Sequence, residues 1–305
     1  MNLPSRSKTY YNEEGFLELM KDILEKGEEE KNDRTGVGTL YRFGETVVHE
    51  LYGKKIPMMS SRHVGFKTVL DELLFFIRGD TDTKKLKSKI WYGNTTESFL
   101  KKRGLDYEVG DMGPMYGFTW RYSGAEYKGC HEDYSKHPVY DQWAKLLESL
   151  EKDPSSRRHI ISSWLPNYLD QGVLAPCHVL QQYQYTEWQG KTYLNCLMYQ
   201  RSADTALAAM SFNALSYSIL MHMICAYLRQ KGKEVWPGKL VHVMGNTHIY
   251  KNHIDNVKIQ IERKPNPYPE LELSGDFSDL SKVTEEQFKV IGYKSCGKLI
   301  YKMAV

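Results

Sequence analysis

The chain has 305 residues, of which 41 are Lys or Arg and 38 are Asp or Glu, and its formal net charge is +3. A charge this close to neutral excludes a general nucleic-acid-binding surface, so any anion binding must be local. The five cysteines are scattered, without the close pairs that zinc sites and small disulfide frameworks need, which indicates reduced thiols. Residues 1–11 contain no apolar stretch of the signal-peptide type, so we expect a soluble protein of the cytoplasm, or of a host cell's cytoplasm if the source is a virus.

Apolar residues at helical spacing predict helices along the chain. The first covers residues 16–27 and ends at Gly27, which suits a C-cap. The second covers residues 64–77, and the third covers residues 140–151. The apolar run 214–228 has the length of a buried helix and includes polar side chains, so we interpret it as a core helix and not as a membrane span.

The middle of the chain reads as strands. Residues 192–200 alternate between two faces, and Gln189-Gly190 predicts a turn from a preceding strand over residues 178–188. Helices flank these strands on both sides in sequence, so we expect an α+β fold with a central mixed or antiparallel sheet. No linker, repeat or change in composition divides the chain, which favours one domain over residues 1–305.

Cys177 follows a proline at the expected start of a strand. A buried cysteine is usually a small core residue. Here the proline and the polar strand end favour a position at the rim of the sheet, where nearby arginines would lower the thiol pKa and make it a nucleophile. Successive residues of a strand point to opposite faces, so His178 is not expected to be the base for this thiol.

Four arginines lie in non-helical segments beside Ser, Thr or Gly: Arg34, Arg157, Arg158 and Arg201. A guanidinium group offers two parallel donors and a fixed charge, which suits a phosphate. These residues are therefore either the parts of a phosphate pocket or ordinary surface arginines.

Further polar residues fit a site for a polar ring and a sugar. Asn213 offers a donor and an acceptor to a pyrimidine edge, or it caps a helix. Asp204 holds ring N–H groups, or it is a turn residue. His248 and Tyr250 face the same way on an extended segment, where both can reach a sugar hydroxyl. Glu72 lies among apolar helix residues, either at an exposed edge or buried with a raised pKa suited to proton transfer.

Ordered motifs run along nearly the whole chain. They are Asn32-Asp33-Arg34-Thr35-Gly36, Asp71-Glu72-Leu73-Leu74, Ile90-Trp91, Gly113-Pro114-Met115-Tyr116-Gly117, Ser156-Arg157-Arg158, Ala175-Pro176-Cys177-His178, Tyr199-Gln200-Arg201-Ser202, Phe212-Asn213, His248-Ile249-Tyr250 and Met303-Ala304-Val305. On these motifs the chain resembles the thymidylate synthase family from about residue 16 to residue 305. The resemblance implies a single catalytic domain that packs sheet to sheet in an obligate homodimer, with no membrane or nucleic-acid partner. It also implies reductive methylation of dUMP to dTMP with 5,10-methylenetetrahydrofolate as co-substrate and no metal.

The resemblance also implies roles for individual residues. Cys177 adds to C6 of uracil, and C5 then attacks the methylene carbon of the folate. Glu72, with water, manages protons at O4 and at the folate, and Tyr116 helps to remove the C5 proton. The implied dUMP contacts are Arg34, Gln200, Arg201, Ser202, Asp204, Asn213, His248 and Tyr250, with Arg157 and Arg158 donated across the dimer interface; Asn213 would read O4 and N3. The implied folate contacts are Trp91, Asn94, Asp204, Phe212 and Ala304.

Differences from the family pattern gather on the folate side. Tyr92 stands where an aspartate normally follows Ile-Trp, and two segments also differ. Residues 207–213 are one residue longer than the usual Leu-Gly-Leu-Pro-Phe-Asn and lack its glycine, and Ser60-Ser61-Arg62-His63 replaces the usual Thr-Thr-Lys-Arg. These departures leave a dUMP hydroxymethylase as an alternative, in which water traps the shared methylene intermediate. A silent nucleotide-binding or RNA-binding homologue is a remote alternative, because Cys177, Glu72 and Tyr116 are all intact.

Overall fold

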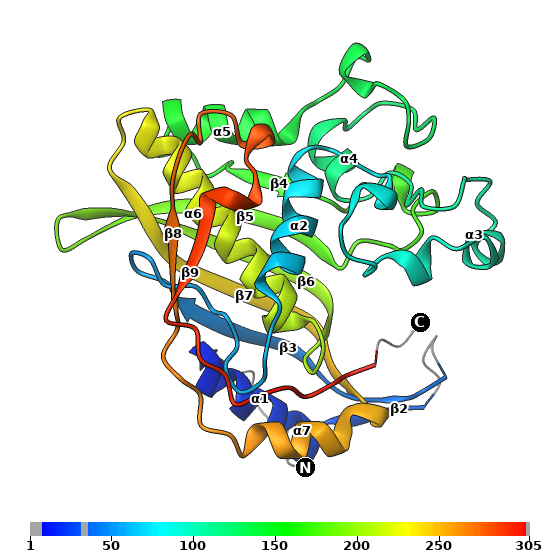
Figure 1. Cartoon of the computed structure of the whole chain (residues 1–305), viewed down its shortest axis with the longest axis vertical. Coiled ribbons are helices and arrows are strands. Elements are labelled where there is room, and N and C mark those ends of the chain that lie inside the picture. The colour runs from blue at the N-terminus through cyan, green and yellow to red at the C-terminus, as the bar shows by residue number, and fades with distance from the viewer. Residues whose placement is uncertain (1–7, 32–35, 303–305) are drawn as a thin grey trace.

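The computed structural model describes residues 8–31 and 36–302, and the account that follows concerns these residues. A seven-stranded mixed sheet forms the centre, in the order β1-β3-β7-β6-β5-β4 with β2 beside β3 (Figure 1). The strands are β1 (Thr9–Tyr11), β2 (Glu28–Glu30), β3 (Thr39–Glu50), β4 (Ile160–Ser162), β5 (His178–Trp188), β6 (Lys191–Asp204) and β7 (Val235–Tyr250). The pairs β1–β3 and β6–β7 are parallel and the others are antiparallel, so the expected mixed sheet is confirmed.

The hairpin between β5 and β6 has the predicted turn. Trp188 pairs with Lys191, which leaves only Gln189 and Gly190 in the loop. Their φ angles of 50° and 70° are the positive pair that a type I′ turn requires. At the other end of the hairpin a β-bulge lies between His178 and Leu180, directly after Cys177. A bulge changes the direction of nearby side chains, so the backbone around the thiol is set by this irregularity.

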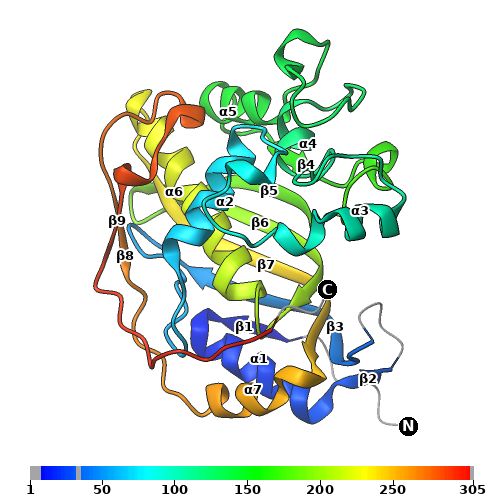
Figure 2. The same ribbon diagram turned by 45° about the vertical axis from the view of Figure 1, so that its right-hand side comes forward.

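Helices cover one face and both ends of the sheet. They are α1 (Asn12–Lys26), α2 (Phe66–Ile77), α3 (Glu97–Arg103), α4 (Gly117–Arg121), α5 (Gln142–Lys152), α6 (Leu215–Gln230) and α7 (Ile254–Ile261). Helices α2 and α6 lie across the sheet in both views, and α1 and α7 lie together at its β1–β3 end (Figures 1 and 2). The three predicted helices are confirmed as α1, α2 and α5, with starts that differ by two to four residues. A Cβ at Gly27 would meet the Ile23 carbonyl oxygen at 2.4 Å, which explains the glycine after α1.

Short helical turns and a second sheet complete the chain. The 3-10 turns are η1 (Thr83–Lys85), η2 (Tyr92–Asn94), η3 (Tyr134–Lys136), η4 (Pro166–Tyr168), η6 (Lys251–His253), η7 (Leu280–Lys282) and η8 (Glu285–Gln287), and η5 (Ala209–Ala214) is a π-helix. The small sheet pairs β8 (Glu270–Leu273) with β9 (Phe288–Ile291) in antiparallel register.

Helix α6 is the centre of the core. Residues 209–230 are long and apolar enough to cross a membrane, but 94% of the apolar window is buried in the protein. The stretch is thus a core helix, as the sequence predicted. It connects the parallel strands β6 and β7, which need such a crossover because a short hairpin cannot join parallel neighbours.

Candidate active site

Cys177 lies at the rim of the sheet, immediately before β5, and its side chain is half-buried. Its backbone N–H donates to the hydroxyl of Tyr116 at 2.9 Å, and its carbonyl accepts from the backbone N–H of Arg201 at 3.0 Å. Tyr116 precedes α4 and is buried, which raises the pKa of its phenol and keeps it protonated. The fold thus brings a thiol and a phenol from distant parts of the sequence into one site.

The imidazole of His178 is buried between aromatic rings. Its centroid lies 5.1 Å from the ring of Tyr116 and 5.4 Å from that of Tyr217. Burial lowers the pKa of His178 to about 4, against a smaller opposite effect of its hydrogen bond with Asn213. The ring is therefore neutral near pH 7, which supports the expectation that His178 is not the base for Cys177.

Glu72 is buried in α2, so the first of its two alternatives, an exposed helix edge, is wrong. The indole N–H of Trp91 donates to Oε1 of Glu72 at 2.8 Å. Burial raises the pKa of Glu72 to about 7, although the hydrogen bond from Trp91 by itself lowers this pKa. A carboxyl group with a pKa near 7 can both give and take a proton at neutral pH, which suits acid–base catalysis. The rings of Trp91 and Tyr116 lie 6.4 Å apart, so Trp91 bridges Glu72 and Tyr116.

Asn213 belongs to the π-helix η5 and does not cap a helix. Its Oδ1 accepts a hydrogen bond from Nε2 of Gln200 at 2.9 Å. Nε2 of Gln200 also donates to the carbonyl of Ser202, and Oε1 of Gln200 lies 2.8 Å from Nε2 of His242. Asn213 and Gln200 are buried, so the amide that the sequence predicts to read a base is held by a network of hydrogen bonds.

Among the three predicted phosphate-binding arginines that the structure describes, Arg201 contacts the Cys177 segment. Arg201 donates through Nε to the carbonyl of Pro176 at 2.9 Å and through Nη2 to that of Ala175 at 2.8 Å. Arg157 and Arg158 are exposed between α5 and β4, and they form no ion pair with a carboxylate of the described residues. Arg34 lies outside the described residues.

Asp204, His248 and Tyr250 gather where β6 and β7 end. Asp204 pairs with His248 across the parallel strands, and Oδ1 of Asp204 accepts the N–H groups of Ala206 and Leu207 at 3.0 Å each. Asp204 is therefore a turn residue, and its binding of ring N–H groups stays a prediction. The rings of His248 and Tyr250 lie 5.0 Å apart, so the prediction that they share a face is confirmed.

The extra residue in the segment after Asp204 is accommodated by the π-helix. The N–H of Asn213 donates to the carbonyl of Ala208 at 2.9 Å, five residues earlier. Such a wide turn takes up one more residue than an α-helical turn, and π-turns are frequent at functional sites. Phe212 is half-buried on this π-helix, so the insertion changes a wall of the site and preserves the buried Asn213.

Arg62 was not predicted as a site residue, and it connects the two segments that depart from the family pattern. Its Nη2 donates to the carbonyls of Ala206 and Leu207 at 3.1 and 2.8 Å and to Oγ of Ser211 at 2.7 Å. Its guanidinium also lies 5.3 Å from the ring of Tyr301 near the C-terminal end. The only signal in the sequence was that both departures belong to the folate side.

Two further predicted folate contacts, Trp91 and Asn94, lie at the 3-10 turn η2. Trp91 is half-buried and bonded to Glu72, and Asn94 is buried at the end of η2. Ala304 lies outside the described residues. The structure therefore describes the surroundings of Trp91, Asn94 and Phe212, and their roles in folate binding stay predictions.

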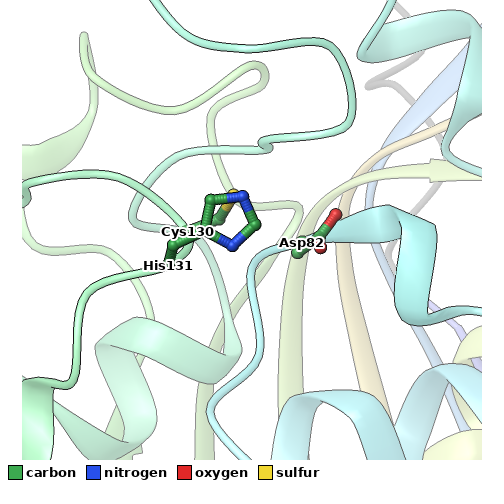
Figure 3. Close-up of side chains that lie close together, drawn as sticks. All are labelled: Asp82, Cys130 and His131. Atoms are coloured by element: carbon green, nitrogen blue, oxygen red, sulfur yellow. The ribbon is translucent and has the colours of Figure 1, made fainter.

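A second cluster of polar side chains contains none of the predicted site residues. Asp82, Cys130 and His131 place their donor atoms within 4.8 Å of one another (Figure 3). Oδ1 of Asp82 accepts the N–H of Lys84 at 3.0 Å, and Oε1 of Glu108 lies 2.8 Å from Nε2 of His131 and 3.6 Å from Sγ of Cys130. These contacts account for the cluster, and the prediction that the reaction needs no metal stays a prediction.

Comparison with known proteins identifies related sequences over the whole chain. The sequence model of the family described as "Thymidylate synthase" matches residues 14–305. A "Bifunctional dihydrofolate reductase-thymidylate synthase" of Paramecium tetraurelia is 41% identical over 100% of this chain, which spans 65% of that protein's length. Proteins named "Thymidylate synthase" from Saccharomyces cerevisiae and Ascaris suum are 38% and 39% identical, each over 96% of this chain and 97% of their own length.

Proposed function

The chain belongs to the thymidylate synthase family, and we propose that it converts dUMP to dTMP with 5,10-methylenetetrahydrofolate. The observation that carries the proposal is the grouping around Tyr116. This phenol accepts from the backbone of Cys177 on one side, and its ring lies near Trp91, the donor to Glu72, on the other. A nucleophile, a phenol and a carboxyl group with a pKa of about 7 are the groups that this reaction needs.

We propose that the pocket recognises dUMP through three groups of residues. Arg201 and Ser202, with Arg34, bind the phosphate, since a guanidinium group matches phosphate oxygens. Asn213, supported by Gln200, reads the uracil edge. Asp204, His248 and Tyr250, gathered where β6 and β7 end, surround the sugar and the neighbouring ring positions.

In the proposed mechanism Sγ of Cys177 forms a bond to C6, and the displaced electron pair passes to C5 and O4. The amide N–H of Asn213 stabilises the negative charge that develops on O4. Glu72 supplies or removes protons at O4, as its pKa near 7 allows. After carbon–carbon bond formation Tyr116 assists removal of the C5 proton, and the electron pair left at C5 expels the folate nitrogen from the methylene carbon. Once that carbon has received hydride from the bound folate, the C6–S bond breaks and the sulfur leaves with its electron pair as the Cys177 thiolate.

The folate side of the site offers the aromatic surface that a pterin ring needs. Trp91 and Phe212 are half-buried, so each keeps an accessible part that a flat ring can cover. When bound, the folate supplies the one-carbon unit and the hydride. We propose that Trp91, Asn94, Asp204 and Phe212, with Ala304, position it over the nucleotide and keep water away.

The exposed face of the sheet supports the proposed homodimer. Along β6 the side chains of Cys196 and Met198 are buried toward the helices, whereas Leu197 is 38% exposed and Tyr199 half-buried on the opposite face. Helices α2 and α6 cover only one face in the two views (Figures 1 and 2). A second copy packed on the open face would bury this apolar surface and bring Arg157 and Arg158 to the other subunit's phosphate site.

Product analysis tests the proposed function. The protein is incubated with dUMP and 5,10-methylenetetrahydrofolate, the nucleotide is identified by mass, and dihydrofolate is followed by absorbance. We expect dTMP and dihydrofolate in equal amounts. Hydroxymethyl-dUMP with tetrahydrofolate would overturn the synthase in favour of the hydroxymethylase, and no reaction would favour the silent homologue. The names of the matched relatives favour the synthase over both alternatives.

A further inference from the structure

His242 contacts the hydrogen-bond network that holds Asn213, the predicted reader of the base, although no predicted role involves His242. It lies in β7, is fully buried, and places Nε2 at 2.8 Å from Oε1 of Gln200. Gln200 in turn donates a hydrogen bond to Asn213. His242 is therefore connected to Asn213 through Gln200.

The orientation of the Gln200 carboxamide follows from its other contacts. The carbonyl of Ser202 can only accept, so the group 2.9 Å from it must be the NH₂ of Gln200. The same NH₂ reaches Oδ1 of Asn213 at 2.9 Å. Oε1 of Gln200 must then face His242, and His242 must present a protonated Nε2.

The surroundings of His242 agree with this single arrangement. Burial lowers the pKa of His242, and the nearby rings of His49 on β3 and His178 on β5 lower it further, so the imidazole is neutral. Within the described residues Nδ1 of His242 is buried and has no hydrogen-bond partner. A neutral imidazole ring carries one N–H proton. On Nε2 this proton is donated to Oε1 of Gln200, whereas on Nδ1 it would be a buried N–H without an acceptor.

A fixed Asn213 amide distinguishes uracil from cytosine. Uracil presents a carbonyl at C4 and an N–H at N3, whereas cytosine presents an amino group and a bare nitrogen at these positions. An amide that is free to rotate by half a turn can pair with either ring, because it exchanges its donor and acceptor. Gln200 prevents this rotation, since a rotated Asn213 would turn its NH₂ toward the NH₂ of Gln200.

We propose that His242 is a positioning residue that determines the choice of uracil over cytosine, because it holds Gln200 and through it Asn213 in one orientation. The inference rests on the proposed function, since it assigns Asn213 to the base of a deoxynucleotide monophosphate. His242 itself touches no reacting atom and acts only through Gln200.

The test compares two substitutions of His242 with a matched control. His242→Leu keeps the bulk and removes the donor, and His242→Gln restores an N–H near the position of Nε2. His222 serves as the control, because it is also buried in the core and bonds through Nε2, in its case to the carbonyl of Lys55 at 2.9 Å. Affinities for dUMP and dCMP are measured by calorimetry, and kcat/KM is measured for both nucleotides.

We expect His242→Leu to lower the preference for dUMP over dCMP about fivefold, since one hydrogen bond is worth about 1 kcal/mol. His242→Gln should recover most of the preference. His222→Leu should lower the melting temperature without changing the preference. A folded His242→Leu protein with the wild-type preference would overturn the proposal, because a purely structural role affects both nucleotides alike.

A second measurement needs no substitution. Nitrogen-15 NMR of the wild-type protein reports which ring nitrogen of His242 carries the proton, and we expect Nε2. A proton on Nδ1, or a charged ring near pH 7, would overturn the proposal even if the leucine variant does not fold. The binding ratio and the tautomer are measured without turnover, so a failure of the proposed function, seen as no product from dUMP, is distinguished from a failure of this inference.

Discussion

The proposed nucleotide side and the proposed folate side of this site are built in different ways. Gln200, His242 and His248 lie on the neighbouring strands β6 and β7, where a continuous ladder of backbone hydrogen bonds sets their spacing. The folate side joins a loop at Arg62, the π-helix η5 and the segment at Tyr301 through a few side-chain contacts. The spacing of residues on paired strands is set by the backbone, so it is preserved when side chains elsewhere are substituted. A wall held together by side-chain contacts changes its shape when one of those side chains is substituted.

The two segments that depart from the family pattern lie on the side that is held by side-chain contacts. The added residue before Asn213 and the altered Ser60–His63 segment both belong to the proposed folate wall, and Arg62 contacts the carbonyls of Ala206 and Leu207 directly. Ser60 and Ser61 are held in turn by buried Glu13, which accepts both of their N–H groups at 2.7 to 2.9 Å. The two altered segments thus form one interconnected unit.

The largest expected effect is on the nucleotide side, from Cys177→Ser. A serine hydroxyl at its ordinary pKa is a poor nucleophile, so turnover should fall by a factor of roughly a thousand or more. Binding of dUMP should be retained, because Arg201 and Asn213 are held by other contacts. Steady-state kinetics and dUMP calorimetry measure the two effects. Cys296→Ser is the matched control, since Cys296 is exposed and lies outside the site; equal losses in both variants would contradict the covalent mechanism.

Glu72→Gln should have the next largest effect and should separate chemistry from binding. Loss of a positioned acid–base group typically costs about a hundredfold or more in kcat. The amide keeps the shape of the carboxyl group and can still accept from Trp91. We expect kcat to fall with little change in the dUMP dissociation constant, and a change confined to binding would assign Glu72 a different role.

The same variant should change how stability depends on pH. The pKa of Glu72 is raised to about 7 in the folded protein by burial, so between its ordinary value and 7 the folded state holds a proton that the unfolded state has lost. Stability is therefore lost as pH rises through 7, by at most about 3 kcal/mol. Urea unfolding at about pH 5 and about pH 9 should show this loss in the wild type and a smaller one in Glu72→Gln. Equal losses would show that Glu72 is not desolvated.

The smallest effect is expected on the folate side, from Arg62→Lys. A lysine cannot reproduce the planar set of donors to Ala206, Leu207 and Ser211, so the KM for the folate should rise about tenfold while dUMP affinity is unchanged. Arg229→Lys is the control, because Arg229 also bonds a carbonyl, that of Val235, and lies over an aromatic ring, that of Trp236. An equal rise in the dUMP dissociation constant would show that the two sides are not independent.

Local patterns in the sequence were sufficient for the elements that position the site. The spacing of apolar residues predicted α1, α2 and α5, and Gln189-Gly190 predicted the hairpin turn, because helix periodicity and positive φ angles depend on near neighbours. The same reading placed Cys177 at a strand start and His248 beside Tyr250 on one face. For Glu72 it offered two alternatives, and only the packing of α2 selected the buried one with its raised pKa.

The sequence by itself determined the family, the helices and hairpin, and the residue types that carry the chemistry, because these follow from local order along the chain. Only the tertiary structure decided which distant residues support them. The contact of Arg62 with residues 206–211 and that of His242 with Gln200 join positions far apart in the sequence. No local periodicity predicts such contacts, because they arise only when strand register and helix packing bring the side chains together.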